Sequence, residues 1–294
     1  MVDLAGRLAH GPCLLLDGGM GTMLMAGGLK PGDAPDRLNL DDPDLVRSVH
    51  AAYVAAGSEA VHANTFGGNP VRLAHFGLAE RCTELNRRAV EIARSASPAF
   101  VLADIGPTGE YLPPVGNGDL GRWREAFDVQ AAALLDAGVD GIHIETMSDL
   151  REAQTALAAV RALDPDLPVL ASLTFDRKRR GFFTVMGNPL IESLNALAAA
   201  GATTVGANCT LTSVDMKDLA AEALTAVSAR LVIQPNAGRP ILDGGGLSYD
   251  QDPVDFVADL SGAIDGGLAA VGGCCGTDPR FIRLLAEKLG RTGS

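Results

Sequence analysis

The chain has 294 residues, of which 47% are hydrophobic and 20% charged, with a mean hydropathy of +0.16. This composition is typical of a globular protein and excludes a disordered or fibrous one. The formal net charge of −12, from 24 Lys and Arg against 36 Asp and Glu, disfavours binding to nucleic acid or to anionic lipids. Because no apolar run could span a membrane and the first ten residues lack a signal-peptide pattern, we expect a cytoplasmic protein without a membrane partner.

Short apolar segments alternate with amphipathic ones along the whole chain. The apolar segments predict β-strands at residues 13–17, 60–64, 101–105, 141–145, 169–174, 204–209, 231–235 and 269–273. Each is followed by a predicted helix, at residues 44–56, 80–95, 122–137, 149–163, 190–200, 215–228, 253–265 and 279–289. Asp-Pro or Asn-Pro pairs at 42–43, 188–189, 252–253 and 278–279 mark helix starts. Glycines mark four helix ends, at Gly57, Gly138, Gly201 and Gly266.

The strand segments read as continuous apolar runs, which is typical of a parallel sheet buried on both faces. Eight strand–helix units in this length predict a (β/α)8 TIM barrel formed by one domain, residues 1–294. The alternative is an open doubly wound sheet, which is disfavoured because no Gly-x-Gly-x-x-Gly phosphate turn is convincing. In a barrel the chemistry lies where the strands end. Polar residues stand at those ends: Asp17, Asn64, Asp104, Glu145, Cys209, Asn236, Cys274 and Cys275. The glycines around position 245 predict a loop.

Three of the five cysteines are expected to meet at this rim. Cys209 closes the sixth strand, and Cys274 and Cys275 follow the eighth between glycines that permit a sharp turn. Three thiolates suit Zn²⁺ with one position left for substrate. A vicinal disulfide, or burial of the cysteines as small apolar residues, is the competing interpretation. Cys13 and Cys82 lie away from the rim and are read as structural.

A zinc ion held by three thiolates activates water poorly, because the anionic sulfurs reduce its Lewis acidity. It is better suited to bind another thiol, whose proton it displaces while leaving a nucleophilic sulfur. The cysteine pattern therefore predicts alkylation of a substrate thiol.

Several motifs in a fixed order resemble the zinc-dependent homocysteine S-methyltransferases. They are Asp17-Gly18-Gly19-Met20-Gly21-Thr22-Met23, Asn64-Thr65-Phe66, Asp104-Ile105-Gly106-Pro107-Thr108-Gly109, Glu145-Thr146, Gly206-Ala207-Asn208-Cys209, Pro235-Asn236-Ala237-Gly238 and Gly272-Gly273-Cys274-Cys275-Gly276-Thr277. The similarity runs from about Leu14 to Leu289 and is greatest to the homocysteine-binding module of cobalamin-dependent methionine synthases.

The resemblance implies a barrel that methylates homocysteine to methionine, with Cys209, Cys274 and Cys275 on zinc. Asn236 matches a position that fills the fourth zinc site before substrate arrives, and Asp17 and Glu145 match acids that hold the substrate ammonium group. Asp17 alternatively serves only as a turn-former. We add the turn at Gly18 and Gly19, whose N–H groups suit a carboxylate, and place Asn208 in the same substrate-binding set.

The methyl donor is less determined by the sequence. Methylcobalamin on a separate corrinoid protein is the leading prediction, because Arg177, Lys178, Arg179 and Arg180 form a basic loop near the rim of an acidic chain. That loop is alternatively a solvated surface. Betaine is disfavoured because only 4% of residues are aromatic and a quaternary ammonium group prefers an aromatic cage. S-methylmethionine or S-adenosylmethionine is the remaining donor class.

Two histidines occupy strand positions where apolar residues are expected, His62 in the second strand and His143 in the fourth. We expect them to hydrogen-bond inside the barrel, either as a satisfied core pair or as a proton relay or gate near the substrate. Two broader alternatives remain open: a non-catalytic zinc or thiol-binding subunit, and a barrel enzyme for phosphorylated substrates in which the cysteines are incidental. The oligomeric state is not predicted.

Overall fold

The computed structural model describes residues 3–243 and 246–291. Within them, eight parallel strands form one sheet in the spatial order β1, β12, β9, β8, β5, β4, β3, β2. Their bounds are β1 (Leu14–Leu15), β2 (Ala60–His62), β3 (Phe100–Ile105), β4 (Gly141–Met147), β5 (Val169–Leu173), β8 (Thr204–Thr212), β9 (Leu231–Asn236) and β12 (Ala270–Val271). The two end strands meet as well, because Glu59 N donates to Leu15 O at 2.9 Å. The sheet thus curls into a nearly closed ring.

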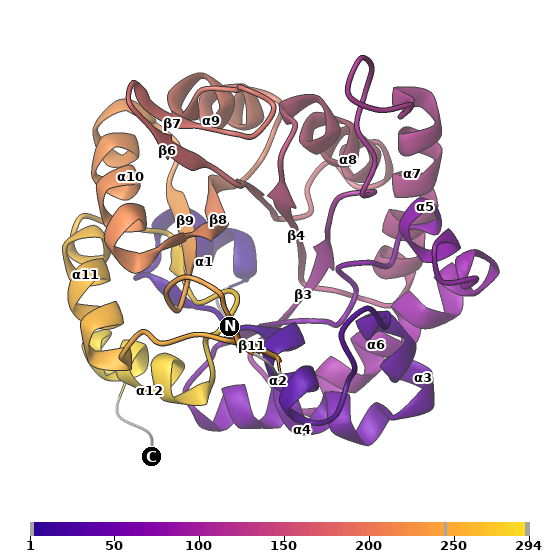
Figure 1. The fold of residues 1–294 in the computed structure, drawn as a ribbon, viewed down its shortest axis with the longest axis horizontal. Helices are drawn as coiled ribbons and strands as arrows, with labels where there is room; N and C mark the ends of the chain where they lie inside the picture. The colour runs from indigo at the N-terminus through magenta and orange to yellow at the C-terminus, as the bar shows by residue number, and fades with distance from the viewer. Residues whose placement is uncertain (1–2, 244–245, 292–294) are drawn as a thin grey trace.

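One helix of the outer layer follows each strand of this ring (Figure 1). These helices are α4 (Pro43–Ala55), α6 (Cys82–Ser95), α7 (Leu120–Asp136), α8 (Leu150–Leu163), α9 (Leu190–Ala199), α10 (Ser213–Ala226), α11 (Pro253–Asp265) and α12 (Pro279–Lys288). The predicted (β/α)8 barrel is therefore confirmed, with every predicted strand and helix present in the expected order.

The helix boundaries follow the predicted signals with two differences. The Asp residue before Pro accepts a hydrogen bond from a first-turn N–H at three helices: Asp42 in α4, Asp252 in α11 and Asp278 in α12. At α9, however, Pro189 is itself the N-cap, and its side chain accepts no capping hydrogen bond. After α11, Gly267 rather than Gly266 takes the left-handed conformation, with φ +100° against −74°. Both helices nevertheless have the predicted boundary at these ends, because α9 begins at Leu190 and α11 ends at Asp265.

The amino end of the barrel is closed by a helix that the sequence analysis did not predict, α1 (Leu4–His10). Figure 1 shows it within the ring rather than in the outer layer. Its Leu4 and Leu8 are buried against an apolar layer formed by Leu14, Leu16, Ala60, Leu102, Leu170, Val232, Ala269 and Ala270. Two residues further along four of these strands the buried side chains are polar: His62, Asp104, Ser172 and Gln234. The barrel interior thus changes from apolar to polar toward its carboxyl end.

Further short elements lie in the segments that follow the carboxyl ends of the strands. They are α2 (Met20–Ala26), η1 (Pro35–Arg37), α3 (Leu38–Asp41), α5 (Pro70–Ala74), η2 (Ala79–Arg81), the hairpin of β6 (Asp176–Lys178) with β7 (Gly181–Phe183), and the pair β10 (Ile241–Asp243) with β11 (Gly246–Ser248). Apart from η2, which overlaps the start of the predicted helix at 80–95, none of them was predicted. Gly244 and Gly245, predicted as part of a loop, lie outside the described residues. Among the helices that are described, none is both long and apolar enough to cross a bilayer.

Candidate functional site

Three thiols gather at the carboxyl end of the barrel. Cys209 lies within β8, and Cys274 and Cys275 follow β12. The Sγ of Cys275 lies 3.8 Å from the Sγ of Cys209 and 4.0 Å from that of Cys274. Because a disulfide requires about 2.05 Å between sulfurs, these are free thiols and the vicinal disulfide is not formed.

The backbone is bent to bring the sulfurs together. Cys209 and Thr210 have φ values of +59° and +48°, a left-handed conformation that is costly for side chains with a Cβ. The pairing of β8 with β9 also loses its regular register between Asn208 and Thr212. Strain held in place at one point of a strand is typical of a functional site, and here it aims the Cys209 side chain toward the end of β12.

The segment after β12 is held by the neighbouring strand. Cys274 N donates to Pro235 O at 2.9 Å, and Cys275 N donates to Asn236 Oδ1 at 3.1 Å. Gly276 follows with φ +81°, and a Cβ there would lie 2.2 Å from the ring of Tyr249. The sharp turn that the flanking glycines permit therefore exists and requires glycine at position 276.

The spacing of the sulfurs fits a tetrahedral zinc site. With Zn–S bonds of about 2.3 Å, a tetrahedron separates neighbouring sulfurs by about 3.8 Å. The distances of 3.8 and 4.0 Å between thiols match this value without rearrangement. Three Cys ligands are also a donor set that zinc prefers.

The three thiols influence each other's protonation. Hydrogen bonds from Cys209 and then from Cys274 lower the pKa of the Cys275 thiol, against the effect of burial, and Tyr249 adds to the lowering. Hydrogen bonds with Cys209 and Cys275, together with burial, raise the pKa of Cys274 well above its usual value. A cation that replaces the thiol protons would relieve this competition, as metal binding to cysteines does in general.

The other predicted substrate residues surround the thiols, but several are already engaged. Asn208 donates to Thr146 Oγ1 and accepts from Thr146 N, both at 2.8 Å, so its side chain bridges β8 and β4. Gly19 N donates to Thr277 Oγ1 at 3.0 Å. A Cβ on Gly18 would lie 2.8 Å from the same hydroxyl, so this glycine is required for close packing. Their roles in substrate binding stay predictions.

Buried carboxyl groups lie beside the thiols. Asp17 is 1% exposed, and the Glu145 side chain is 13% exposed. Burial raises the pKa of Glu145, and the nearby charge of Cys209 adds to this effect. Asp104, which the resemblance did not assign to substrate, is buried, and no described residue forms a hydrogen bond with its Oδ1. Burial, and then the charge and hydrogen bond of Glu145, raise the pKa of Asp104 well above its usual value.

The two interior histidines hydrogen-bond to each other as expected. His62 Nε2 lies 2.9 Å from His143 Nδ1, and both rings are buried. His62 Nδ1 lies 2.6 Å from Asp17 Oδ1, and His143 Nε2 lies 2.8 Å from Ser172 Oγ. His62, His143 and Glu145 also have the residue types and spacing of a metal site, although the two imidazoles are in direct contact.

Sequence reasoning missed Tyr249, which follows β11 and lies against the turn that contains the cysteines. The sequence predicted no secondary structure for the β10–β11 pair that precedes it. Burial, and then the charge of Cys275 and a hydrogen bond with it, raise the pKa of the Tyr249 hydroxyl. No local pattern in the sequence signals this contact.

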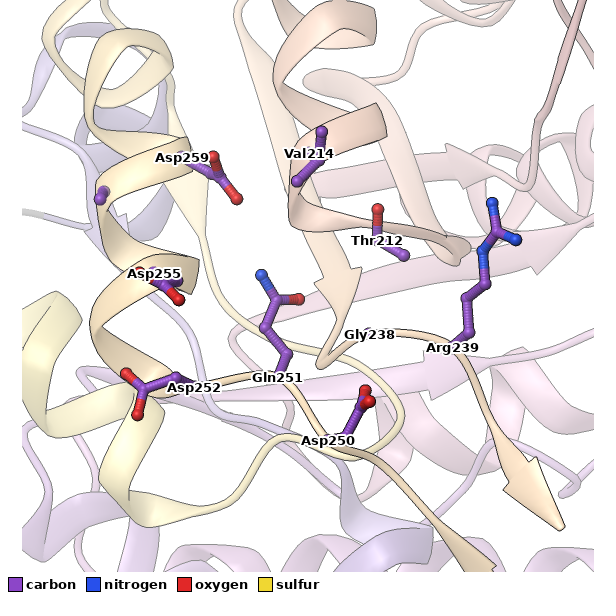
Figure 2. A pocket seen from close by; sticks show the side chains of 10 residues that line it. Thr212, Val214, Gly238, Arg239, Asp250, Gln251, Asp252, Asp255 and Asp259 are labelled. Carbon is purple, nitrogen blue, oxygen red and sulfur yellow. The ribbon is translucent and has the colours of Figure 1, made fainter.

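A cavity of about 690 Å³ opens between the segments that follow β8 and β9 and the start of α11 (Figure 2). Its lining is acidic and includes one arginine: Thr212, Val214, Gly238, Arg239, Asp250, Gln251, Asp252, Asp255, Ala258 and Asp259. Figure 2 places Asp255 and Asp259 on one helix, across the opening from Thr212 and Val214. None of the cysteines lines this cavity.

The basic loop forms the β6–β7 hairpin. Arg177 pairs with Asp215 at 3.1 Å and with Asp218 at 2.6 Å, and Lys178 pairs with Asp176 at 2.9 Å. Within the described residues Arg179 and Arg180 form no ion pair, so these two arginines carry the unneutralised charge of the hairpin.

A parallel barrel with three free thiols and buried carboxyls at its carboxyl end has the layout of a barrel enzyme, whose chemistry lies at that end. Comparison with known proteins identifies the family. The chain belongs to the homocysteine S-methyltransferase family, whose model matches residues 14–289. The predicted family and the methyltransferase class are confirmed, and the alternatives of a non-catalytic subunit and of an enzyme for phosphorylated substrates are set aside.

Two curated relatives are methionine synthases. That of Mycobacterium tuberculosis is 32% identical over 92% of this chain, and that of Mycobacterium leprae is 30% identical over 98%. The alignments cover 24% and 25% of those proteins, so the chain spans about a quarter of their length. Among solved structures, the metallated homocysteine methyltransferase MmuM of Escherichia coli has a TM-score of 0.78 at 24% identity, covering 96% of this chain and 98% of that one, which supports the fold.

Proposed function

We propose that this enzyme methylates the sulfur of homocysteine to give methionine, with zinc held by Cys209, Cys274 and Cys275. The observation that carries the proposal is the spacing of 3.8 and 4.0 Å between free sulfurs at the end of a barrel. Membership of the family supplies the acceptor, and the methionine synthase relatives agree with the product. Zinc bound there would displace the proton of an incoming thiol and keep its sulfur nucleophilic.

The chain's own residues bind and orient the amino acid. Asp17 and Glu145 supply negative charge for the ammonium group, and Asp104 with its unpartnered Oδ1 lies beside them. The substrate carboxylate is assigned to the backbone at Gly18 and Gly19, and Asn236 is the proposed exchangeable fourth metal donor. Asn208 acts by fixing Thr146, and thereby the strand end that carries Glu145.

A corrinoid protein carrying methylcobalamin is the proposed methyl donor. Segments on the carboxyl side of the barrel expose apolar side chains, including Tyr111, Val115, Val185 and Val214 at 43–65% exposure. Exposed apolar side chains, together with the two arginines of the β6–β7 hairpin that form no ion pair within the described residues, are suited to a macromolecular partner. The methionine synthase relatives are about four times as long as the region matched here, which leaves room in them for further modules.

A sulfonium donor, S-methylmethionine or S-adenosylmethionine, is the second candidate. It is favoured by the acidic cavity at the carboxyl ends of β8 and β9, because Asp250, Asp252, Asp255 and Asp259 outnumber the single Arg239 and would attract a cation. Betaine lacks comparable support, since the cavity has no aromatic lining residue.

The test combines metal analysis with turnover. Zinc content and zinc–sulfur X-ray absorption are measured with and without homocysteine, and methionine formation is then assayed separately with a methylcobalamin-loaded corrinoid protein, free methylcobalamin, each sulfonium compound and betaine. We expect about one zinc per chain, a fourth sulfur ligand when homocysteine is added, and turnover with the corrinoid protein. A chain that binds no zinc, or that methylates no homocysteine with any donor, would contradict the proposal.

A further inference from the structure

Four side chains form a continuous hydrogen-bonded chain through the barrel interior: Asp17, His62, His143 and Ser172. The successive contacts measure 2.6, 2.9 and 2.8 Å, and each member is at most 7% exposed. The four residues come from the segment after β1 and from the strands β2, β4 and β5, with β3 lying between β2 and β4 in the sheet. The family motifs at Asp17 and Glu145 assign no role to either histidine.

The carboxylate at one end sets the direction of the first bond. A carboxylate only accepts, so His62 Nδ1–H donates to Asp17 Oδ1, and His62 N also donates to Asp17 Oδ2 at 2.9 Å. His62 therefore occupies both oxygens of the acid that is proposed to meet the substrate ammonium. The proton count on the two imidazoles then decides how much negative charge remains for the substrate.

The neighbours favour a charged His62 beside a neutral His143. Burial opposes the charge on His62, but the charge and hydrogen bond of Asp17 outweigh it and raise the pKa of His62 above its usual value. Burial and the charge of His62 lower the pKa of His143 well below its usual value. In this arrangement His62 Nε2–H donates to His143 Nδ1, and His143 Nε2–H donates to Ser172 Oγ.

One proton fewer reverses the second and third bonds without breaking any contact. His143 Nδ1–H then donates to His62 Nε2, the Ser172 hydroxyl donates to His143 Nε2, and His62 Nδ1–H still donates to Asp17. Both states satisfy every ring nitrogen, so the chain can gain or lose one proton at little cost in hydrogen bonding. The ionisable groups that interact electrostatically with His62 or its partners include Asp17, His50, Tyr53, Asp104, His143 and Glu145.

We propose that these four hydrogen-bonded side chains store one proton in the free enzyme and release it to solvent when the substrate ammonium group binds. His62 and His143 are then positioning residues that match the charge of the amine subsite to its ligand. The inference rests on the proposed function, because it takes the ligand to be an amino acid. An imidazolium and an ammonium group beside the same carboxylate repel each other, and the loss of one proton removes that repulsion. Binding then replaces the positive charge of the imidazolium with that of the substrate ammonium group.

The experiment measures proton release with a ligand that has no thiol proton. Isothermal titration calorimetry of the full chain with methionine, in buffers of different ionisation enthalpy, gives the number of protons released. The deaminated analogue 4-(methylthio)butanoate serves as the comparison, because it retains the thioether and carboxylate but lacks the ammonium group. We expect about one proton for methionine below the pKa of His62 and none for the analogue, with affinity for methionine rising about tenfold per pH unit there.

Matched variants assign the proton. His62→Gln is expected to bind methionine without releasing a proton and with affinity independent of pH, whereas His50→Gln is expected to behave like the wild type. His50 is an appropriate control because it is fully buried in α4 and burial lowers its pKa to about 4, so it is neutral in the tested range.

The mutation-free measurement keeps the proposal testable even if His62→Gln fails to fold. Methionine binding without proton release, or equal proton release with the deaminated analogue, would overturn the proposed storage of a proton and leave the proposed function intact. Persistent release in His62→Gln would also overturn it. If neither methionine nor homocysteine binds, the proposed function and this inference fall together.

Discussion

At its amino end the barrel is closed by α1, with Leu4 and Leu8 buried on a layer of leucine, valine and alanine. At its carboxyl end the same strands carry thiols, carboxyls and imidazoles, and three residues there, Thr146, Cys209 and Thr210, have left-handed backbone conformations. One end therefore holds apolar packing and the other holds strain and buried polar groups. Such a division is expected when stability and chemistry are supplied by opposite ends of one sheet.

This contrast makes the two ends separable by experiment. Shortening a buried apolar side chain at the amino end of the barrel should lower stability and leave the chemistry of the site unchanged, because no amino-end side chain contacts the thiols in the described structure. Removal of a thiol should do the reverse, since the three sulfurs contribute competing protons rather than apolar packing.

The largest expected effect is that of Cys275→Ser. Loss of a residue that merely supports a metal ligand costs about 10–100-fold in metal affinity or activity, so loss of a proposed ligand should cost more than about 100-fold. We expect little bound zinc and a matching loss of homocysteine methylation, measured by metal analysis and methionine formation. Thermal unfolding of the metal-free variant should match that of metal-free wild type.

Cys82→Ser is the matched control for this prediction. Cys82 is buried at the start of α6, outside the cluster of three thiols, and its Sγ lies 3.1 Å from Gly68 O, a hydrogen bond that a serine hydroxyl can retain. Zinc content and activity should be unchanged. Equal losses in Cys82→Ser and Cys275→Ser would show that the effect comes from folding rather than from the metal site.

The second prediction concerns the amino end. Leu8→Ala removes a fully buried side chain from the apolar layer and should lower the free energy of unfolding by about 2–5 kcal/mol. Leu163→Ala, at a position that is 47% exposed, should cost much less. Denaturant unfolding measures both. A large change in the KM for homocysteine in folded Leu8→Ala would break the separation of the two ends.

The sequence predicts the repetitive part of this molecule better than its individual contacts. The strands and outer helices follow from local apolar periodicity and from Asp-Pro starts, which act over a few residues. The convergence of Cys209 with Cys274 and Cys275 follows from strand ends in a barrel. In contrast, the hydrogen bond between Asn208 and Thr146 and the packing of Tyr249 against Gly276 are contacts between distant segments, which no short window of the sequence contains.

The amino-end helix was missed for a related reason. α1 has only seven residues, and its apolar positions Leu4 and Leu8 acquire meaning only once a barrel exists for them to close. Asp104 was recognised as a polar strand end but not as a group with an unpartnered buried oxygen, since burial depends on the packed structure.

The third prediction uses a buried acid of the carboxyl-side loops. Asp36 is 4% exposed, and burial raises its pKa to about 6, from about 3.9 in the unfolded chain. The folded state therefore binds a proton more tightly than the unfolded state. The resulting stability is present below about pH 4 and is lost as the pH rises through about 6, by about 3 kcal/mol in all.

Asp36→Asn should abolish that dependence. The difference in free energy of unfolding between variant and wild type should shift by about 3 kcal/mol in favour of the variant from pH 4 to pH 7, as measured by urea denaturation at several pH values. Asp41→Asn, at an exposed side chain nearby, is the control and should show little shift. A pH-independent difference for Asp36→Asn would mean that this acid is as easily ionised in the folded state as in the unfolded state.

The smallest expected effect tests whether the carboxyl end of the barrel also binds a corrinoid protein. Arg179→Ala with Arg180→Ala should raise the KM for a methylcobalamin-loaded corrinoid protein by about 2–30-fold, because each of the two exposed charges contributes roughly 0.2–1 kcal/mol. The KM for homocysteine should not change, since neither arginine contacts the thiol site. Arg177→Ala is the matched control, because Asp215 and Asp218 already neutralise Arg177 within the molecule. Equal loss of donor use and homocysteine binding, or an equal effect of Arg177→Ala, would contradict a docking role for this hairpin and favour a small cationic donor in the acidic cavity.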